Sequence, residues 1–170
     1  MNLPKNFFDS DVLDVAAKLV GKTLLRKFDN GESISARITE VEAYRGEEDL
    51  ACHASKGKTK RTEVMYMEAG TIYIYLVYGM YYMLNIVCAE VDNPQAILIR
   101  AVEGYDGPGK LSKFFKIDKS FNKENIFKNN YLSIIDDGYV PEIVCKPRVG
   151  IDYAGDIWKN KPWRFINTIK

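Results

Sequence analysis

The sequence predicts a mixed α/β domain dominated by antiparallel strand pairs, and three observations support this fold class. At 170 residues the chain is long enough for one sizeable core but short for two, so a single domain is expected. Several short runs alternate apolar and polar residues around turn signals, as β-hairpins do. Apolar residues at helical spacing occur near the N-terminus, in a segment bounded by capping residues.

The first element expected is a helix within FFDSDVLDVAAKLVG. Asp9 or Ser10 can cap its start, because a side-chain oxygen at that position accepts a free backbone N–H. Gly21 can end it, since glycine readily takes the left-handed conformation that follows many helices. Between these residues the apolar positions recur at helical spacing, at Leu13, Ala16 and Val20.

The next elements expected are strands. TLLRKFDNGESISARITEVEAY contains two of them around the turn signal at residues 29–31. Residues 71–77 and 80–88 predict a second hairpin, closed tightly at Tyr78 and Gly79, and QAILIRAVE predicts a further strand. GPGKLSKFFKI predicts a loop that leads into a short helix, and residues 136–169 predict strands broken by proline and glycine.

The composition is that of an ordinary folded protein. Apolar residues make up 46% and charged residues 28% of the chain, which argues against a disordered protein. No apolar run reaches the roughly 18 to 20 residues that span a bilayer, and the N-terminus shows no signal-peptide pattern. The three cysteines are widely spaced and odd in number, so they do not make a disulfide framework. We therefore expect reduced thiols, a cytoplasmic location and no membrane contact.

Charge is distributed unevenly along the chain, although the net charge is only +1. Basic residues cluster in KGKTKR, at residues 56–61, and again toward the C-terminus, whereas acidic residues gather in residues 40–49. Such asymmetry is typical of proteins that meet a charged partner, but solvated surface lysine is the simpler interpretation for any single residue.

The stretch SISARITEVE, residues 33–42, raises a question about two carboxylates. Ile34, Ala36 and Ile38 mark the core face of this strand, because alternate residues point to opposite faces. Continuing the alternation puts Glu40 and Glu42 on the same apolar side. An inward carboxylate is costly unless it is paired, hydrogen-bonded or used in chemistry. The alternatives are that the strand bends or bulges here, or that an arginine neutralises the acids internally.

The residue types present exclude several common classes of enzyme. His53 is the one histidine of the chain, and Cys52 beside it does not have a metal-ligand spacing, so we expect no metal site. There is no Ser-His-Asp order, P-loop or glycine-rich dinucleotide turn. General-base chemistry by a carboxylate is the catalysis that remains most plausible.

A series of fragments, taken in order, resembles the alkyladenine (3-methyladenine) DNA glycosylase family. The fragments are ITEVEAY, His53 after EEDLAC, YIYLVYGMYYMLN, ILIRAVEG, GPGKL and KPRVGI, and they extend from the first helix to the closing KPWRF. The resemblance implies one glycosylase domain over residues 1–170, with a mixed, mainly antiparallel curved sheet, surrounding helices and a protruding β-hairpin. It also implies a monofunctional enzyme without cofactor or lyase activity, which excises damaged purines from DNA by hydrolysing the N-glycosidic bond.

The resemblance assigns catalytic roles to two residues. Glu42 matches the family's catalytic acid, which positions and deprotonates a water and stabilises positive charge on the sugar. Arg100 matches the arginine beside that water and glutamate, and its charge is expected to hold Glu42 ionised.

The resemblance also places a pocket for the damaged base, which must leave the stack before it can react. Tyr44, His53 and Tyr75 match the pocket walls, where rings stack on the faces of the purine. Asn85 matches an asparagine that rejects the exocyclic amine of guanine, and Ala51 with the His53 backbone is expected to read the purine edge.

Contacts to double-stranded DNA are expected at two further places. Tyr78 matches the side chain that enters the duplex to fill the space left by the extruded nucleotide, and Met80 follows it at the hairpin tip. Lys110 and Arg148 are expected to contact phosphates. A duplex containing damaged purines is thus the expected partner, for a monomeric protein that is associated with the nucleoid if prokaryotic.

Some conspicuous residues receive no role in chemistry. Thr62 stands where many family members carry asparagine, which concerns local loop contacts only. Packing is the expected role of five aromatic residues, Tyr73, Tyr81, Tyr82, Trp158 and Trp163. Two other functions remain open: a non-catalytic single-stranded nucleic-acid binder with a tyrosine stacking surface, and a glycoside hydrolase that uses Glu40 with Glu42.

Overall fold

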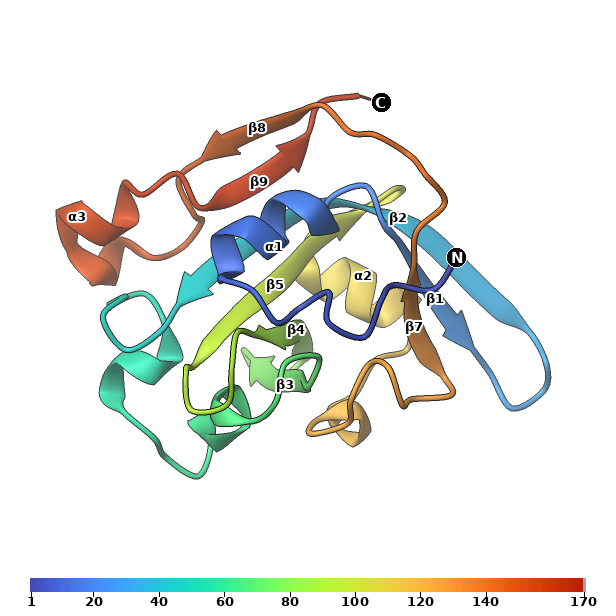
Figure 1. Cartoon of the computed structure of the whole chain (residues 1–170), viewed down its shortest axis with the longest axis horizontal. Helices are drawn as coiled ribbons and strands as arrows, with labels where there is room; N and C mark the ends of the chain where they lie inside the picture. The colour runs from blue at the N-terminus through green and yellow to red at the C-terminus, as the bar shows by residue number, and fades with distance from the viewer. Residues whose placement is uncertain (170) are drawn as a thin grey trace.

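One curled antiparallel sheet organises the protein, as the sequence predicts (Figure 1). The computed structural model describes residues 1–169. Six strands follow one another across the sheet in the order β3-β4-β5-β2-β1-β7, and β6, β8 and β9 extend it at the sides. The strands are β1 Thr23–Lys27, β2 Ser33–Arg45, β3 Ile72–Val77, β4 Tyr81–Cys88, β5 Gln95–Val102, β6 Tyr105–Asp106, β7 Leu132–Ile135, β8 Ile143–Lys146 and β9 Arg164–Asn167.

Short helices complete the domain. The α-helices are α1 Val12–Leu19, α2 Pro108–Phe114 and α3 Gly155–Lys159, and the 3₁₀ turns are η1 His53–Lys56, η2 Thr62–Tyr66, η3 Lys119–Phe121 and η4 Asp152–Ala154. The last segment was expected to hold strands alone, yet it carries η4 and α3 between β8 and β9. None of the helices within residues 1–169 has the length and apolar character needed to cross a membrane.

Helix α1 forms where the sequence predicts it, but its cap differs. Asp11 is the N-cap, and its side chain accepts a hydrogen bond from the Leu13 N–H. Asp9 and Ser10 lie before the helix and were the wrong candidates. The helix buries its apolar stripe on the main core and ends at Leu19; Val20 is its C-cap, and Gly21 follows in the left-handed conformation.

The main core occupies one face of the sheet. In β3 the core residues are Ile72 and Ile74, and in β4 and β5 they alternate in the same way. Because side chains alternate across a strand, the residues between them point to the opposite face. Two smaller apolar clusters lie there, one built from η1, η2 and the sheet and the other from residues 51, 151 and 154. The candidate site lies on this second face.

An irregularity between β2 and β5 decides where the two glutamates point. The pairing runs from Ile38 with Val102 to Glu40 with Ala101, and its register shifts on both sides of Glu40. Before it Ile38 faces the core, and after it Val41 does, so the alternation changes phase. The expectation that Glu40 and Glu42 share the core face is therefore wrong, because the strand bulges between them and Ile38. Both carboxylates point to the second face.

Hairpin β3–β4 forms one edge of the sheet, and helix α2 packs against β4. Tyr78 and Gly79 both have positive φ, 54° and 66°, which is the geometry of a tight type I′ turn. Helix α2 lies so close to β4 that a Cβ at Gly109 would meet the Tyr81 ring at 2.5 Å. Tyr82 packs against the main core. Tyr81 and Tyr82 thus serve in packing, as expected.

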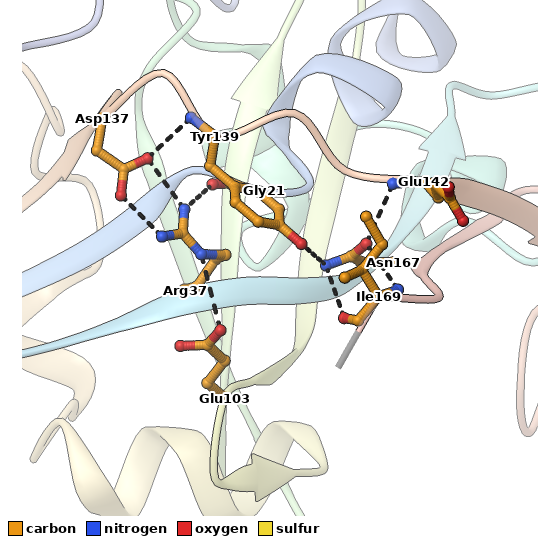
Figure 2. Close-up of polar contacts among 8 residues, drawn as sticks. All are labelled: Gly21, Arg37, Glu103, Asp137, Tyr139, Glu142, Asn167 and Ile169. Atoms are coloured by element: carbon orange, nitrogen blue, oxygen red, sulfur yellow. Dashed lines mark hydrogen bonds and ion pairs between the residues drawn. The ribbon is translucent and has the colours of Figure 1, made fainter.

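The C-terminal strands are tied back to the sheet by a polar network (Figure 2). The Arg37 guanidinium donates to both carboxylate oxygens of Asp137, at 3.0 and 2.8 Å, and lies 4.0 Å from the centre of the Tyr139 ring. The Tyr139 hydroxyl in turn accepts a hydrogen bond from Asn167 at 3.0 Å. The network fixes the crossing segment after β7 and holds β9, which pairs with β2 from Glu40 to Glu42.

Candidate active site

The site is built on a row of residues that are directly paired across the sheet. Tyr73 on β3 pairs with Asn85 on β4, and Asn85 pairs with Leu98 on β5. Leu98 also pairs with Glu42 on β2, which pairs with Arg164 on β9. Neighbouring strands lie about 4.8 Å apart, so Glu42 stands roughly 10 Å from Asn85. Strand register thus sets the distance between the carboxylate of Glu42 and the candidate pocket.

Glu42 is wholly buried, and both of its carboxylate oxygens are bound. Oε1 accepts a hydrogen bond of 2.8 Å from the Tyr44 hydroxyl and lies 3.8 Å from Arg100 Nη1. Oε2 accepts one of 2.6 Å from the backbone N–H of Val149. A buried carboxylate held in this way has a fixed orientation, as a positioned base requires.

The pKa of Glu42 is raised above its ordinary value. Desolvation by burial is the largest cause, and it outweighs the charge of Arg100 and the hydrogen bonds from Val149 and Tyr44, which lower the pKa. The charge of Arg100 therefore lowers the pKa of Glu42, as expected, but burial raises that pKa by more. A carboxylate whose pKa is raised takes up a proton more readily near neutral pH, which suits a general base.

Glu40 belongs to the same cluster, but its carboxylate lies closer to a guanidinium than the carboxylate of Glu42 does. Arg164 Nη1 donates to its Oε1 at 2.6 Å, and Arg100 Nε lies 3.9 Å from its Oε2. The two glutamates lie on one strand and share Arg100, instead of facing each other across a cleft as a two-carboxylate hydrolase requires. Within residues 1–169 the Nε of Arg100 is buried and has no hydrogen-bond partner.

A small cavity of about 50 Å³ opens beside this cluster and is lined by all five residues expected to form the pocket. Tyr44 joins the two parts of the site, because its ring lines the cavity and its hydroxyl binds Glu42. The lining residues are Tyr44, Ala51, Cys52, His53, Met65, Tyr73, Tyr75, Asn85, Ala96 and Tyr153.

Three rings form the aromatic side of this cavity. The His53 and Tyr75 rings are 4.6 Å apart, and Tyr73 lies 5.4 Å from Tyr75. His53 Nδ1 lies 2.9 Å from the Tyr73 hydroxyl. Desolvation, with the nearby charges of Arg61 and Lys56, lowers the pKa of His53 to about 4. His53 is therefore neutral at neutral pH, so its ring adds no charge to the pocket.

Tyr73 was expected to serve in packing alone, and that expectation is incomplete. It does pack in the cluster behind the pocket, but it also lines the cavity and binds His53. Strand alternation could have shown this, because Tyr73 and Tyr75 share a face. Tyr153 was missed for a different reason: it approaches from the C-terminal segment, and no local pattern marks it.

Asn85 and Ala51 present polar groups at the cavity. Asn85 is buried, and its Nδ2 donates to the carbonyls of Tyr73 and Met83, at 3.1 and 3.3 Å. These contacts leave Oδ1 unused. The Ala51 N–H donates to Asp49, and its carbonyl accepts a hydrogen bond of 3.0 Å from the Tyr153 hydroxyl. A ligand that reads the Ala51 carbonyl must therefore compete with Tyr153.

The tip of the β3–β4 hairpin projects into solvent, as its expected role in DNA contact requires. Tyr78 is 88% exposed and Met80 57% exposed, an unusual state for two large apolar side chains. The type I′ turn keeps the tip short, since Met80 N–H donates to the Val77 carbonyl at 3.2 Å. Two exposed apolar side chains at a tight turn can enter a gap in another molecule.

The expected phosphate contact of Arg148 is wrong. Its side chain and that of Asp49 are both 0% exposed, and they form a bidentate ion pair with distances of 2.6 and 2.9 Å. A buried guanidinium with its donors on a carboxylate cannot reach a phosphate. Lys110 is exposed on α2, so its expected role stays a prediction.

The basic segment 56–61 reaches the rim of the cavity. The Arg61 guanidinium lies 5.3 Å from the centre of the Tyr75 ring, within the range of a cation–π contact. Thr62 ends this segment and ties it together: its Oγ1 donates to the Gly57 carbonyl and accepts a hydrogen bond from Thr59 N–H. Threonine therefore provides the local loop contacts at this position.

The remaining expectations concern cysteine, tryptophan and metal. Cys52, Cys88 and Cys145 are all free thiols. Trp158 and Trp163 are half-buried and lie 5.9 Å apart, which agrees with the expected packing role. No cluster of three or more His, Cys, Asp and Glu side chains suited to a metal ion occurs in residues 1–169.

Comparisons with known proteins agree on one family. The family model described as methylpurine-DNA glycosylase (MPG) matches residues 6–106 and 104–169. A protein of Borrelia garinii subsp. bavariensis is 44% identical over 176 residues, which covers 96% of this chain and 94% of that protein. Proteins of Methanocella arvoryzae and Legionella pneumophila strain Corby are 42% and 43% identical and cover 97% and 96% of this chain and 92% of their own lengths. Each is named "Putative 3-methyladenine DNA glycosylase".

Proposed function

Because the chain belongs to the methylpurine-DNA glycosylase family, which implies base-excision repair of alkylated purines, we propose that it flips a damaged purine out of duplex DNA and hydrolyses its glycosidic bond with a water activated by Glu42. The observation that carries the proposal is the placement of a buried carboxylate and a guanidinium on the same sheet face as an aromatic cavity. Alkylated and deaminated purines are the proposed substrates, in double-stranded DNA.

The proposed reaction needs a single carboxylate. Ionised Glu42 takes a proton from a water whose oxygen forms a bond to C1′ of the sugar, while the C1′–N9 bond breaks and its electron pair leaves with the base. The carboxylate also stabilises the positive charge that develops on the sugar. Arg100 lies beside Glu42 and favours its ionised form through its positive charge. No lysine nucleophile takes part, so strand cleavage is not expected.

Binding of the base is proposed to rest on the rings of the cavity. Tyr44, His53 and Tyr75 offer electron-rich faces, and stacking on such faces contributes about 1 to 3 kcal/mol per base. An alkylated cationic purine gains further from the quadrupole of the tyrosine rings. Asn85 occupies the far side of the cavity from Glu42, where it is proposed to exclude the exocyclic amine of guanine.

The two exposed side chains of the hairpin tip are proposed to enter the duplex. Extrusion of a nucleotide leaves a gap in the stack, and an apolar side chain that fills it offsets part of the cost of unstacking. Tyr78 is the main candidate because its side chain is the more exposed, and Met80 lies beside it across Gly79. Lys110 is proposed to contact a phosphate.

A base-release assay tests the proposed function. Duplexes that each contain one 3-methyladenine, 7-methylguanine, hypoxanthine or ethenoadenine are incubated with the protein, and free base is measured by chromatography. Release from at least one of them, without strand cleavage, is the expected result. If none of the four is released while single-stranded DNA binds as tightly as duplex, the protein is a nucleic-acid-binding module with a tyrosine surface instead.

A further inference from the structure

The buried pair of Asp49 and Arg148 lies directly behind the candidate active site, where it connects two loops. The two side chains stand 99 residues apart in the chain and are both fully buried. Arg148 also donates to the Ala43 carbonyl at 3.0 Å, and its guanidinium lies 4.9 Å from the centres of the Tyr44 and Trp163 rings. The pair is therefore enclosed by strand β2 and the C-terminal segment.

Each member of the pair fixes a different part of the site. Arg148 precedes Val149, whose backbone N–H donates to Glu42 at 2.6 Å. Asp49 accepts hydrogen bonds from the N–H groups of Arg45 and Ala51, both at 3.0 Å. Ala51 lines the cavity, so the same carboxylate shapes the pocket loop and anchors the loop that reaches Glu42.

We propose that Asp49 and Arg148 are positioning residues, which hold the Val149 N–H against Glu42 and the Ala51 loop against the cavity. One ion pair would thus align the Glu42 carboxylate with the bound purine. The proposal rests on the function proposed for Glu42. It assigns no contact with substrate to either residue. A bidentate pair suits this task, because two parallel hydrogen bonds fix the relative orientation of the groups they join.

Energetics favour a positioning role over one in stability. A buried ion pair loses most of its attraction to the cost of desolvation, and an apolar pair of the same volume often gives equal stability. Charge at this place has a second effect, since Arg148 and the Val149 N–H both act to lower the pKa of Glu42. Removing the pair should therefore raise that pKa, and a change confined to packing should not.

Other groups also face Glu42 and must stay unchanged in the test. They come from five elements: Glu40 and Tyr44 on β2, Tyr75 on β3, Arg100 on β5, Arg164 on β9, and Tyr153 on η4. The variants are chosen to leave all of them in place. Asp49→Asn combined with Arg148→Gln keeps hydrogen-bonding groups but removes both charges, and Arg148→Lys keeps the charge but loses the fork.

The control uses a matched pair elsewhere. Arg37 and Asp137 also form a bidentate pair between β2 and the C-terminal half, 100 residues apart (Figure 2). The Glu42 carboxylate has its contacts with Tyr44, Val149 and Arg100 instead. Arg37→Gln combined with Asp137→Asn removes the same chemistry at a distance from the site. The double variants are compared at a temperature at which circular dichroism shows them folded.

The measurement is the single-turnover rate of base release from about pH 5 to about pH 9, with a duplex that contains one hypoxanthine, or one 3-methyladenine if that base is released faster. The acidic limb of the profile should move to higher pH by about 0.5 to 1 unit in Asp49→Asn/Arg148→Gln, by less in Arg148→Lys, and not at all in the control. An unmoved limb in the folded double variant would overturn the proposal.

If that double variant does not fold, Arg148→Lys decides, and a profile identical to that of the wild type overturns the proposal. The function itself is tested separately in the same experiment. If the wild type releases no base, or if Glu42→Gln releases it at the wild-type rate, the function proposed for Glu42 fails. An active wild type, an inactive Glu42→Gln and an unmoved limb together reject the positioning role alone.

Discussion

At the scale of single residues, burial is what gives the candidate site its chemistry. Glu42 and His53 both have pKa values displaced toward the neutral form, and in both cases desolvation is the largest cause. For the carboxylate the displacement makes a stronger base. For the imidazole it keeps a flat, uncharged ring in the cavity, which a cationic purine can approach without repulsion.

The low pKa of His53 also has a consequence for stability. The folded state favours the neutral imidazole, because the pKa of His53 is lower there than in the unfolded state. This contribution to the free energy of unfolding is complete above the ordinary pKa of 6.5 and is lost as the pH falls toward about 4. We predict that the free energy of unfolding of the wild type falls more steeply over this window than that of His53→Gln, as measured by urea denaturation. Equal slopes for the two proteins would show that His53 binds a proton as readily in the folded state as in the unfolded state.

At the scale of elements, the second face of the sheet collects the site. Strands β2 to β5 each contribute side chains that alternate with core residues, and the loops at residues 46–56 and 147–154 cover them. The β3–β4 hairpin belongs to this face at one end and projects into solvent at the other. One hairpin thus carries both the proposed pocket wall, Tyr75, and the proposed wedge, Tyr78.

The wedge role makes a prediction for the hairpin. Tyr78→Ser should weaken binding to a damaged duplex by about tenfold or more, because the filled gap is lost, but should leave binding to a damaged single strand nearly unchanged. Fluorescence anisotropy with matched oligonucleotides measures both affinities. Tyr131→Ser, at another exposed tyrosine, is the control. Equal losses on duplex and single strand would reject the wedge.

The elements also show what sequence can and cannot predict. The two hairpins and the first helix were predictable because their turn signals and their apolar spacing are local. The phase change at Glu40 was open, since nothing in SISARITEVE marks a bulge, and only the pairing with β5 reveals it. Arg148 was assigned to phosphate because its partner, Asp49, is 99 residues away and local sequence gives no sign of it. Long-range partners, not residue types, limited the prediction.

At the scale of the whole molecule, the site and the core use opposite faces of one sheet. Helix α1 covers the core face (Figure 1), whereas the cavity and the basic segment 56–61 at its rim belong to the second face. With a net charge of only +1, attraction to DNA must come from this local arrangement of charge. Contacts between phosphates and these basic side chains are therefore expected to make affinity fall steeply as salt rises.

Salt dependence tests that arrangement. Affinity for a damaged duplex should fall as salt rises, and Lys110→Ala should reduce the slope of log K against log[salt] by about 0.9, the value for one phosphate contact. Lys18→Ala, on the exposed side of α1, should leave the slope unchanged. Titrations at several salt concentrations give these slopes. An unaltered slope in Lys110→Ala would remove that residue from the DNA interface.

The single-turnover rate of base release by Glu42→Gln is the most direct measurement of the proposed mechanism. The substitution keeps the size of the side chain and its ability to accept from Val149 N–H, but it removes the base. The rate is predicted to fall by about a thousandfold or more, while affinity for the damaged duplex changes by less than about twofold. Release at the wild-type rate by Glu42→Gln would contradict the central role of this carboxylate.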